Sequence, residues 1–436
     1  MRTNARRRLV TFEASSDPLA STDLITNLLP ALGDALAGDG PAIAPTTPGP
    51  EYGQIRTMLR VEAPLERPDI AVVLPTSGST GAPKGALLPA SALLHSARAT
   101  LDRLGGPGRW VLALPPTRIA GLQVLVRSLV AGTTPVPIED PFTPSAFCAA
   151  TDLLSQPPGG AAAGRRYTAL VPTQLVRLLD AGPLAVAALA SYDAVLVGGG
   201  ASSTALLDRA RAAGVRVVTT YGMTETCGGC VYDGLPLEGV TVTVRPTGGA
   251  VDGVTPAPAV AGSPGEGVAG SPGEGVAGSG RVLLGGPVLF AGYRLRPDLT
   301  SAALADGWHV TGDLGRLHQD GRLDILGRVD DVVVSGGVNV PLLAVERAVA
   351  SYPGVAEAAA AGVPDPEWGA RVVVYVVLRP GATAPSLARV RDHVAASHPR
   401  AYAPKDLVVV ESLPLLPSGK LDRAALASST PAGPAR

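Results

Sequence analysis

Short apolar segments alternate with amphipathic ones through the first half of the chain. Residues 71–74 form an apolar run that ends in a turn of small residues, and residues 91–104 then place leucine and alanine at helical spacing. The same order returns, as strand and helix at 110–114 and 121–131, and as strand, helix and strand at 193–197, 202–213 and 215–219. Ser202 is the predicted N-cap of the helix at 202–213. Repeated alternation of strand and helix predicts an α/β fold with largely parallel sheets.

The second half contains a low-complexity segment followed by a second folded unit. Residues 248–280 are rich in glycine, proline, alanine and serine, and the sequence VAGSPGEG at 260–267 is repeated at 268–275, which predicts a flexible surface loop. Predicted elements then resume in the order helix, strand, helix, strand at 341–352, 372–378, 386–397 and 407–410. We therefore expect a large domain over 1–327, a linker over 328–331 and a small domain over 332–436, with a disordered tail from Ala427.

Composition narrows the class of protein. The 436 residues are 46% hydrophobic and 17% charged, with a formal net charge of -1, so the chain has no basic excess of the kind that binds nucleic acid. No apolar run reaches the length of about eighteen residues that a membrane span needs, and no signal peptide is evident. We expect a cytoplasmic protein. Cys227 and Cys230 have no second ligand pair at zinc spacing, so we expect two packed thiols there.

The first chemical motif follows the predicted strand at 71–74. It reads Thr76-Ser77-Gly78-Ser79-Thr80-Gly81-Ala82-Pro83-Lys84-Gly85, in which hydroxyls and unhindered amides can converge on phosphate oxygens and Lys84 adds a positive charge. It is not a Walker A loop, because such a loop needs Gly-Lys followed by serine or threonine. Here Pro83 precedes Lys84 and interrupts that spacing. Taken alone, the segment is also compatible with a plain turn.

Two further motifs carry acidic residues. In Tyr221-Gly222-Met223-Thr224-Glu225-Thr226, Glu225 could hold a hydrated magnesium ion and Thr224 could reach a phosphate, although a capped helix start has the same sequence. In Trp308-His309-Val310-Thr311-Gly312-Asp313, which resembles part of a hairpin, Asp313 could accept both hydroxyls of a ribose. A turn aspartate is the alternative explanation.

The last two motifs lie at the domain boundary and near the C-terminus. Gly327-Arg328-Val329-Asp330-Asp331, followed by Ser335-Gly336-Gly337-Val338-Asn339, is suited to a hinge, because changes of backbone angle are easily absorbed there. Pro417-Ser418-Gly419-Lys420 places a lysine on a glycine turn. Alone, such a lysine is usually a solvated charge.

In this order, the five motifs resemble the signature of the adenylate-forming superfamily, which includes acyl-CoA synthetases, peptide-synthetase adenylation domains and luciferases. The resemblance covers residues 71–426 and implies a large N-terminal domain of stacked, mostly parallel sheets with helices, plus a small mobile C-terminal α+β domain. It implies ATP and coenzyme A as substrates and Mg²⁺ as the metal ion.

The resemblance also implies a role for each motif residue. The ATP or AMP site would contain Thr76, Ser77, Gly78, Ser79, Thr80, Gly81, Lys84, Gly199, Gly200, Ala201, Tyr221, Gly222, Thr224, Asp313 and Arg328. Lys420, Thr224, Glu225 and Arg328 would be the catalytic residues, with Glu225 as the magnesium ligand. Asp330 would be the hinge residue, and Gly336 and Gly337 would line the path of the pantetheine arm of coenzyme A.

The acid substrate is indicated by the sequence PPTRIAGL at 115–122. Together with YGMTETCGGCVYD at 221–233, it most resembles the ligases that act on o-succinylbenzoate in menaquinone biosynthesis. That acid is a dicarboxylate, so one carboxylate would be activated and Arg127 would recognise the other through a bidentate pair. Arg118, Gly121 and Gly199 would also line the acid site. Arg118 stands where the family usually has histidine, and the region before the phosphate loop is short.

Three alternatives remain at this point. The chain could be an aryl- or fatty-acid-CoA ligase, although Arg118 and Arg127 disfavour a purely apolar tunnel because an unpaired buried charge is costly. It could load a carrier protein, although no aspartate for an amino-acid ammonium group is evident. It could also be a non-catalytic nucleotide-binding protein. A homodimer is compatible with the sequence but not indicated by it.

Overall fold

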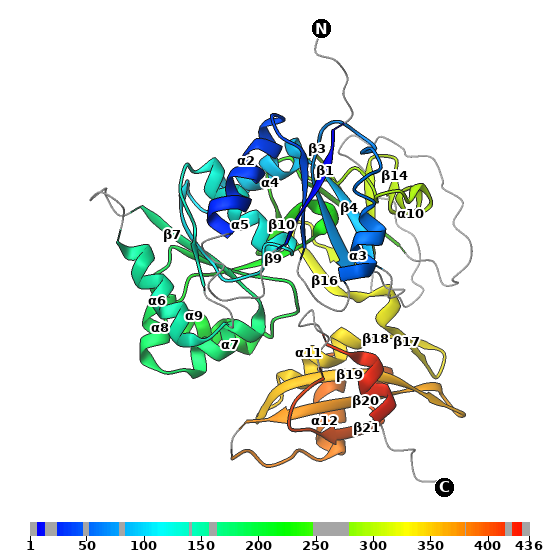
Figure 1. Ribbon diagram of the computed structural model, residues 1–436. Coiled ribbons are helices and arrows are strands. Elements are labelled where there is room, and N and C mark those ends of the chain that lie inside the picture. The colour runs from blue at the N-terminus through cyan, green and yellow to red at the C-terminus, as the bar shows by residue number, and fades with distance from the viewer. Residues whose placement is uncertain are drawn as a thin grey trace.

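A computed structural model describes the chain over residues 7–13, 24–46, 52–77, 83–138, 142–156, 164–246, 279–379, 381–414 and 421–429. The large unit contains the elements from β1 to β16, and the smaller unit contains those from β17 to α13 (Figure 1). The chain passes from one to the other through a 3₁₀ turn at Val329–Asp331. This is the place where the sequence predicted a linker.

A seven-stranded sheet forms the centre of the large unit. Its strand order is β11-β10-β9-β8-β7-β5-β6, and the five strands from β9 to β6 are parallel. The bounds are β5 Gly108–Leu112, β6 Val136–Pro137, β7 Arg165–Leu170, β8 Ala194–Val197, β9 Val217–Met223, β10 Gly228–Tyr232 and β11 Leu235–Pro236. Trp110 and Leu112 point to one face of the sheet and Val111 to the other, and all three are buried. Because both faces are covered, the strands have continuous apolar sequences.

A four-stranded sheet lies beside it, with β1, β2 and β3 parallel and β4 antiparallel to β3. The bounds are β1 Leu9–Glu13, β2 Ala42–Thr46, β3 Ile70–Ser77 and β4 Pro83–Pro89. The sequence predicted a direct passage from the strand at 71–74 through a loop to a helix, and this was wrong because β4 intervenes. Its sequence PKGALLP begins with proline and glycine, which are depleted in strands.

Helices cover the sheets. A π-helical turn at Leu24–Leu28 leads into α2 Leu29–Ala37, which joins α4 Ala90–Arg103 and α5 Ile119–Val130 in the core between the two sheets, while α3 Tyr52–Leu59 packs on the other face of the smaller sheet. The outer face of the central sheet is covered by α6 Pro144–Ser155, α7 Pro172–Asp180, α8 Pro183–Ala190 and α9 Thr204–Ala212. The N-cap of α9 is Ser203, whose Oγ accepts from the Leu206 amide at 3.2 Å, so the prediction of Ser202 was wrong by one residue.

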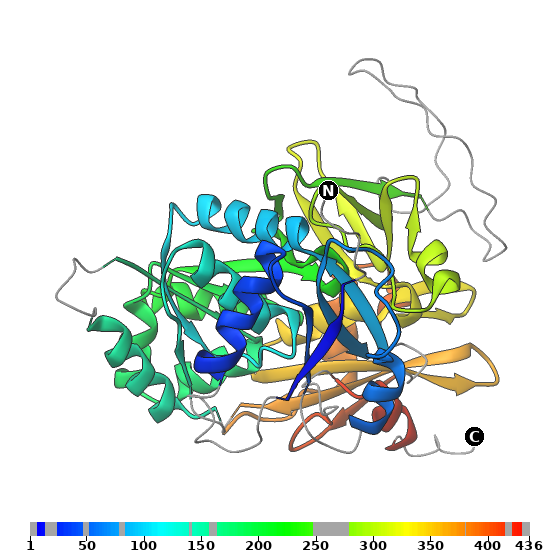
Figure 2. The same ribbon diagram turned by 45° about the horizontal axis from the view of Figure 1, so that its top comes forward.

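The third sheet of the large unit is antiparallel. Its bounds are β12 Thr241–Arg245, β13 Ser279–Gly285, β14 Leu304–Ala305, β15 Trp308–Leu317 and β16 Leu323–Arg328, with α10 Pro297–Ala303 beside it. The hairpin expected around Asp313 is formed by β15 and β16. Ser279 and Gly280 belong to β13, so the predicted loop ends earlier than residue 280, and its repeat lies outside the described residues. Figure 2 shows this sheet at the opposite end of the unit from α6 to α9.

The small unit contains one sheet with helices on both faces. The bounds are β17 Val332–Ser335, β18 Val338–Pro341, α11 Leu342–Ala350, β19 Val355–Asp365, β20 Gly369–Leu378, α12 Leu387–Ala395, a 3₁₀ turn Arg400–Tyr402, β21 Asp406–Val409 and α13 Arg423–Ser429. Leu426 of α13 is buried against the sheet, and Tyr375 Oη donates to its carbonyl at 2.8 Å. The prediction of a disordered tail from Ala427 was therefore wrong for 427–429, because α13 extends to Ser429 and the contacts of Leu426 hold this helix against the sheet. None of the helices in the described ranges is long and apolar enough to cross a bilayer.

Candidate active site

The site lies where adjacent parallel strands of the central sheet end. Residues 198–200 follow β8, and Tyr221 lies near the end of β9, which pairs with β8. Gly198 approaches β9 so closely that an added Cβ would lie 2.2 Å from Thr220 Oγ1, so only glycine fits. The carboxyl edge of such a sheet is a common place for ligands to bind. The turn with the predicted nucleotide-site residues Gly199, Gly200 and Ala201 therefore follows β8, next to the strand that carries Tyr221.

An aspartate from the third sheet meets this edge. Tyr221 Oη donates to Asp313 Oδ2 at 2.7 Å, and Arg328 Nη1 donates to Asp313 Oδ1 at 3.3 Å. Burial and the neighbouring Asp313 charge raise the pKa of Tyr221 well above its ordinary value, so its hydroxyl stays protonated and remains a donor. Asp313 itself is buried. The structure thus brings together three residues that the sequence could only place in separate motifs.

The two ends of the phosphate motif belong to β3 and β4. Thr76 pairs with Lys84 between the two strands, and Thr76 Oγ1 donates to the Lys84 carbonyl at 3.3 Å. The predicted phosphate residues Gly78, Ser79, Thr80 and Gly81 lie outside the described part of the chain, as does Lys420.

A tyrosine that the sequence analysis missed stands between the phosphate motif and Glu225. Tyr293 Oη donates to Glu225 Oε1 at 2.7 Å, while Lys84 Nζ lies 5.4 Å from the centre of the Tyr293 ring. Tyr293 comes from the segment between β13 and α10, outside all five motifs, and no sequence signal distinguished it from an ordinary aromatic residue.

Glu225 fits a magnesium ion. Its carboxylate supplies a hard oxygen ligand of the kind that Mg²⁺ prefers. In proteins Mg²⁺ usually binds one or two carboxylates and keeps water and phosphate oxygens as its other ligands. Glu225 lies in the 3₁₀ turn Thr224–Thr226 with Thr224 beside it. Its backbone carbonyl accepts from the Phe290 amide at 2.9 Å, which fixes the turn. His309 and Phe290 pack edge to face beneath it, with ring centres 5.5 Å apart.

The two cysteines after this turn are buried in the core. Burial raises the pKa of Cys230 to about 12, and it raises that of Cys227 as well. Within the described ranges, no group of three or more acidic, histidine or cysteine side chains could hold a metal ion.

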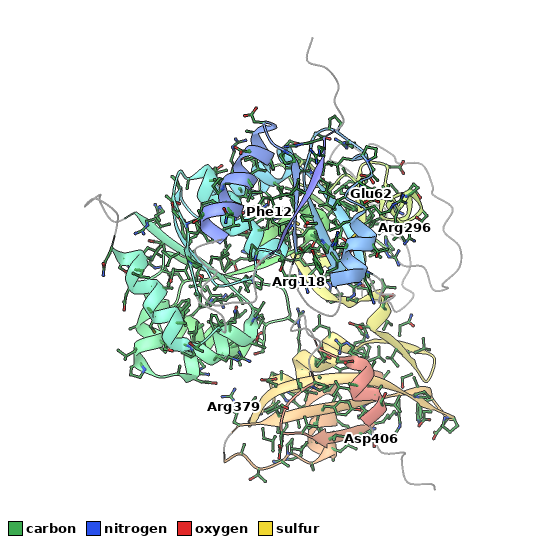
Figure 3. All side chains as sticks on the ribbon, in the orientation of Figure 1. Phe12, Glu62, Arg118, Arg296, Arg379 and Asp406 are labelled. Carbon is green, nitrogen blue, oxygen red and sulfur yellow. The ribbon has the colours of Figure 1, made fainter. Side chains whose placement is uncertain are left out.

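Helix α5 packs against the segment that follows Glu225. Gln123 Nε2 donates to the Cys227 carbonyl at 2.7 Å, and an added Cβ on Gly228 would lie 3.1 Å from Gln123 Cγ. Gly121 lies in the first turn of α5, and Arg118 directly precedes the helix. Arg118 is exposed, and Figure 3 shows it at the edge of the large unit nearest the small one.

Arg127 lies one turn beyond Gln123 and is deeply buried, with 3% of its surface exposed. Its guanidinium carbon lies 5.1 Å from the centre of the Trp110 ring, and Nη2 donates to Tyr232 Oη at 3.3 Å. Nε has no hydrogen-bond partner among the described residues, and none of their carboxylates forms an ion pair with this side chain. Burial lowers the pKa of Arg127, because desolvation disfavours its charged form.

The linker begins at Arg328, the residue that contacts Asp313. Arg328 Nη2 lies 3.6 Å from Asp330 Oδ2, so one guanidinium faces both Asp313 and the predicted hinge residue. Gly336 and Gly337 form the turn between β17 and β18, both with positive φ. They belong to the small unit and are not in the cluster around Glu225.

Comparison with known proteins shows to which family the chain belongs. Residues 15–294 match the family described as AMP-binding enzyme, and residues 344–420 match the AMP-binding enzyme C-terminal domain. The chain is 42% identical over 405 residues to "Probable 2-succinylbenzoate-CoA ligase" of Mycobacterium tuberculosis, covering 92% of this chain and 94% of that protein. It is 34% identical over 378 residues to sulfoacetate-CoA ligase of Cupriavidus necator, covering 83% and 67%.

Solved structures share the fold. The o-succinylbenzoate CoA synthetase of Bacillus subtilis, in complex with its acyl-adenylate intermediate, superposes with a TM-score of 0.69 at 24% identity, covering 97% of this chain and 88% of that one. ATP-bound MatB of Rhodopseudomonas palustris superposes with a TM-score of 0.72 at 22% identity, covering 98% and 97%. The fold class expected from the sequence is confirmed, and the chain belongs to the AMP-binding enzyme family.

Proposed function

We propose that this chain is an ATP-dependent, AMP-forming carboxylate-CoA ligase that acts on 2-succinylbenzoate. The observation that carries the proposal is the convergence of Lys84, Tyr221, Glu225, Asp313 and Arg328 from separate parts of the sequence on one edge of the central sheet. A decayed, non-catalytic relative would have no reason to keep these polar groups together. The family membership supports the same chemistry.

In the first half-reaction, a carboxylate oxygen attacks the α-phosphorus of ATP and pyrophosphate leaves, which produces an acyl-AMP. Asp313 accepts the ribose hydroxyls and is held ready for them by Tyr221 and Arg328. Thr224 and the phosphate motif bind phosphate oxygens. Magnesium held at Glu225 would neutralise phosphate charge. Lys420 stabilises the charge that develops on the α-phosphate, as an electrostatic catalyst.

In the second half-reaction, the coenzyme A thiolate attacks the acyl carbonyl and AMP leaves. We propose that the small domain rotates about Asp330 between the two steps, which removes Lys420 and brings Gly336 and Gly337 to the pantetheine arm. The ion pair between Arg328 and Asp330 supports this assignment, because it connects the ribose contact with the linker. A homodimer is not required, since all of these residues come from one chain.

The acid specificity rests on Arg127. A buried guanidinium without a carboxylate partner is unfavourable in the free protein, and an incoming anionic group would complete its hydrogen bonding. One carboxylate of 2-succinylbenzoate would react while the other pairs with Arg127. Sulfoacetate also carries a second anionic group beside its carboxylate, so a different dianionic acid is the main alternative.

The test is acid-dependent AMP release from ATP with magnesium and coenzyme A. The acids to compare are 2-succinylbenzoate, sulfoacetate, benzoate and octanoate. The proposal predicts selective turnover of 2-succinylbenzoate. Preference for sulfoacetate would keep the dianionic site and change the substrate, whereas equal use of benzoate or octanoate would remove the role of Arg127.

A further inference from the structure

Tyr293 contacts both charged groups of the predicted triphosphate and metal site. Its hydroxyl donates to Glu225 Oε1 at 2.7 Å, and its ring presents a face to Lys84 Nζ at 5.4 Å. A carboxylate that accepts a hydrogen bond on one oxygen has its orientation fixed while the other oxygen keeps its lone pairs. A cation over an aromatic ring is likewise restrained without losing its charge.

The backbone of Tyr293 is firmly placed. The segment continues the smaller sheet beyond β4, with a bridge between Tyr293 and Ala86 and a hydrogen bond of 2.7 Å from the Arg294 amide to the Gly85 carbonyl. Glycine suits Gly85, because an added Cβ would lie 2.8 Å from Met58 Sδ and 3.1 Å from Arg294 Cβ. The Tyr293 amide also donates to Thr300 Oγ1 at 2.9 Å.

The side chain of the next residue secures the segment. Arg294 is buried, and its guanidinium donates to Glu66 Oε2, to the Leu59 carbonyl at the end of α3 and to three backbone carbonyls of the loop between α3 and β3. The Tyr293 ring packs edge to face on Phe290, with centres 5.0 Å apart. A side chain with this much support can impose a geometry on Glu225 instead of following it.

We propose that Tyr293 is a positioning residue that holds the Glu225 carboxylate in the orientation for binding magnesium with ATP, while its ring restrains Lys84. This inference rests on the proposed function and adds a residue to its metal site. Removal of the hydroxyl leaves Glu225 free to rotate. Removal of the ring also releases Lys84. Substitution by phenylalanine therefore removes only the hydrogen bond to Glu225, whereas substitution by leucine removes the contact with Lys84 as well.

The experiment measures ATP binding to the full chain by calorimetry, once with excess magnesium and once with EDTA. Magnesium should strengthen ATP binding to the wild type, and in Tyr293→Phe that strengthening should fall by about tenfold, the scale of a lost hydrogen bond to a charged group. Binding in EDTA should not change, because Lys84 keeps its ring. Mn²⁺ signals in electron paramagnetic resonance, recorded with ATP bound, should show a weakened site in the same variant.

Tyr192→Phe is the matched control. Tyr192 Oη is also buried and makes a hydrogen bond of 2.7 Å, to Thr151 in the core behind the central sheet. That variant should keep the full magnesium effect even if it melts earlier. Tyr293→Leu should lose the magnesium effect and also bind ATP more weakly in EDTA, and it serves as the test if the phenylalanine variant does not fold.

An unchanged magnesium effect in folded Tyr293→Phe, or in the leucine variant where only that one folds, would overturn the inference. That result would leave the proposed function standing. Failure of the wild type to bind ATP at all would instead contradict the proposed function. The two failures are therefore distinguishable.

Discussion

The two ends of the candidate site treat charge differently. At the nucleotide end, Asp313 is paired with Arg328 and Tyr221, and Glu225 accepts from Tyr293. At the proposed acid end, Arg127 is more deeply buried, and among the described residues its guanidinium contacts Tyr232 and the face of Trp110. The proposed nucleotide end is held by contacts within the protein, whereas we propose that a ligand pairs with the charge at the acid end. The difference teaches that paired charges can serve both the stability of the fold and its function, whereas an unpaired buried charge costs stability and is kept for function.

Lys420→Ala should have the largest effect. It should lower the rate of acyl-AMP formation by about 10²- to 10³-fold, the scale of a lost electrostatic catalyst. Thioester formation from supplied acyl-AMP should be largely retained, because the lysine is expected to leave the site in that step. Measurement of both half-reactions in the folded variant checks this, and loss of both would remove the assigned role.

Arg127→Met should separate binding from stability. It should reduce kcat/KM for 2-succinylbenzoate by a factor equivalent to about 2 to 4 kcal/mol of transition-state binding, the cost of losing a buried charge pair with the substrate. The same variant should unfold at a higher temperature, because it removes a buried charge that has no counter-ion in the free protein. Steady-state kinetics and thermal melting test both parts. A lower melting temperature together with unchanged kinetics would mean that Arg127 serves only the fold.

Asp313→Asn sharpens the comparison from the nucleotide end. The amide keeps the shape but loses the charge that faces Arg328, so KM for ATP should rise by an amount equivalent to about 1.5 to 3 kcal/mol. KM for the acid should stay the same, because Arg127 is not involved. A rise in the acid KM of the same size would show that the two ends are not independent.

Tyr221→Phe should have the smallest effect, visible mainly at alkaline pH. The folded-state pKa of Tyr221 is raised above its ordinary value of 10.0, so its contribution to stability is complete below that pH and is lost as the pH rises through the folded pKa. The wild type should therefore lose more unfolding free energy than the variant above about pH 10. Urea titrations at neutral and alkaline pH measure this, and equal losses would contradict it.

Elements could be predicted from the sequence where the pattern of their own residues determines their structure. The strand containing Trp110, Val111 and Leu112 was found because burial on both faces produces an unbroken apolar run. Strand β4 was missed because proline and glycine mask it, and its pairing with β3 depends on a neighbouring chain segment. The family was recognised because several short motifs in a fixed order are specific even where each alone is not.

Features that depend on contacts between distant parts of the chain could not be predicted from the sequence. Tyr293 is 68 residues from Glu225 along the chain, and nothing in its local sequence indicates that its hydroxyl ends on that carboxylate. A substrate role for Arg127 was likewise predicted, but its sequence context could not show that Nε has no hydrogen-bond partner among the described residues. Both facts are set by tertiary packing, which periodicity does not encode.

The most direct test of the account is acid-dependent exchange of pyrophosphate into ATP, measured for the wild type and Arg127→Met with 2-succinylbenzoate and with benzoate. The account predicts exchange by the wild type with the dianionic acid, a strong loss with that acid in the variant, and little exchange with benzoate in either protein. Equal exchange with benzoate and 2-succinylbenzoate in both proteins would contradict it.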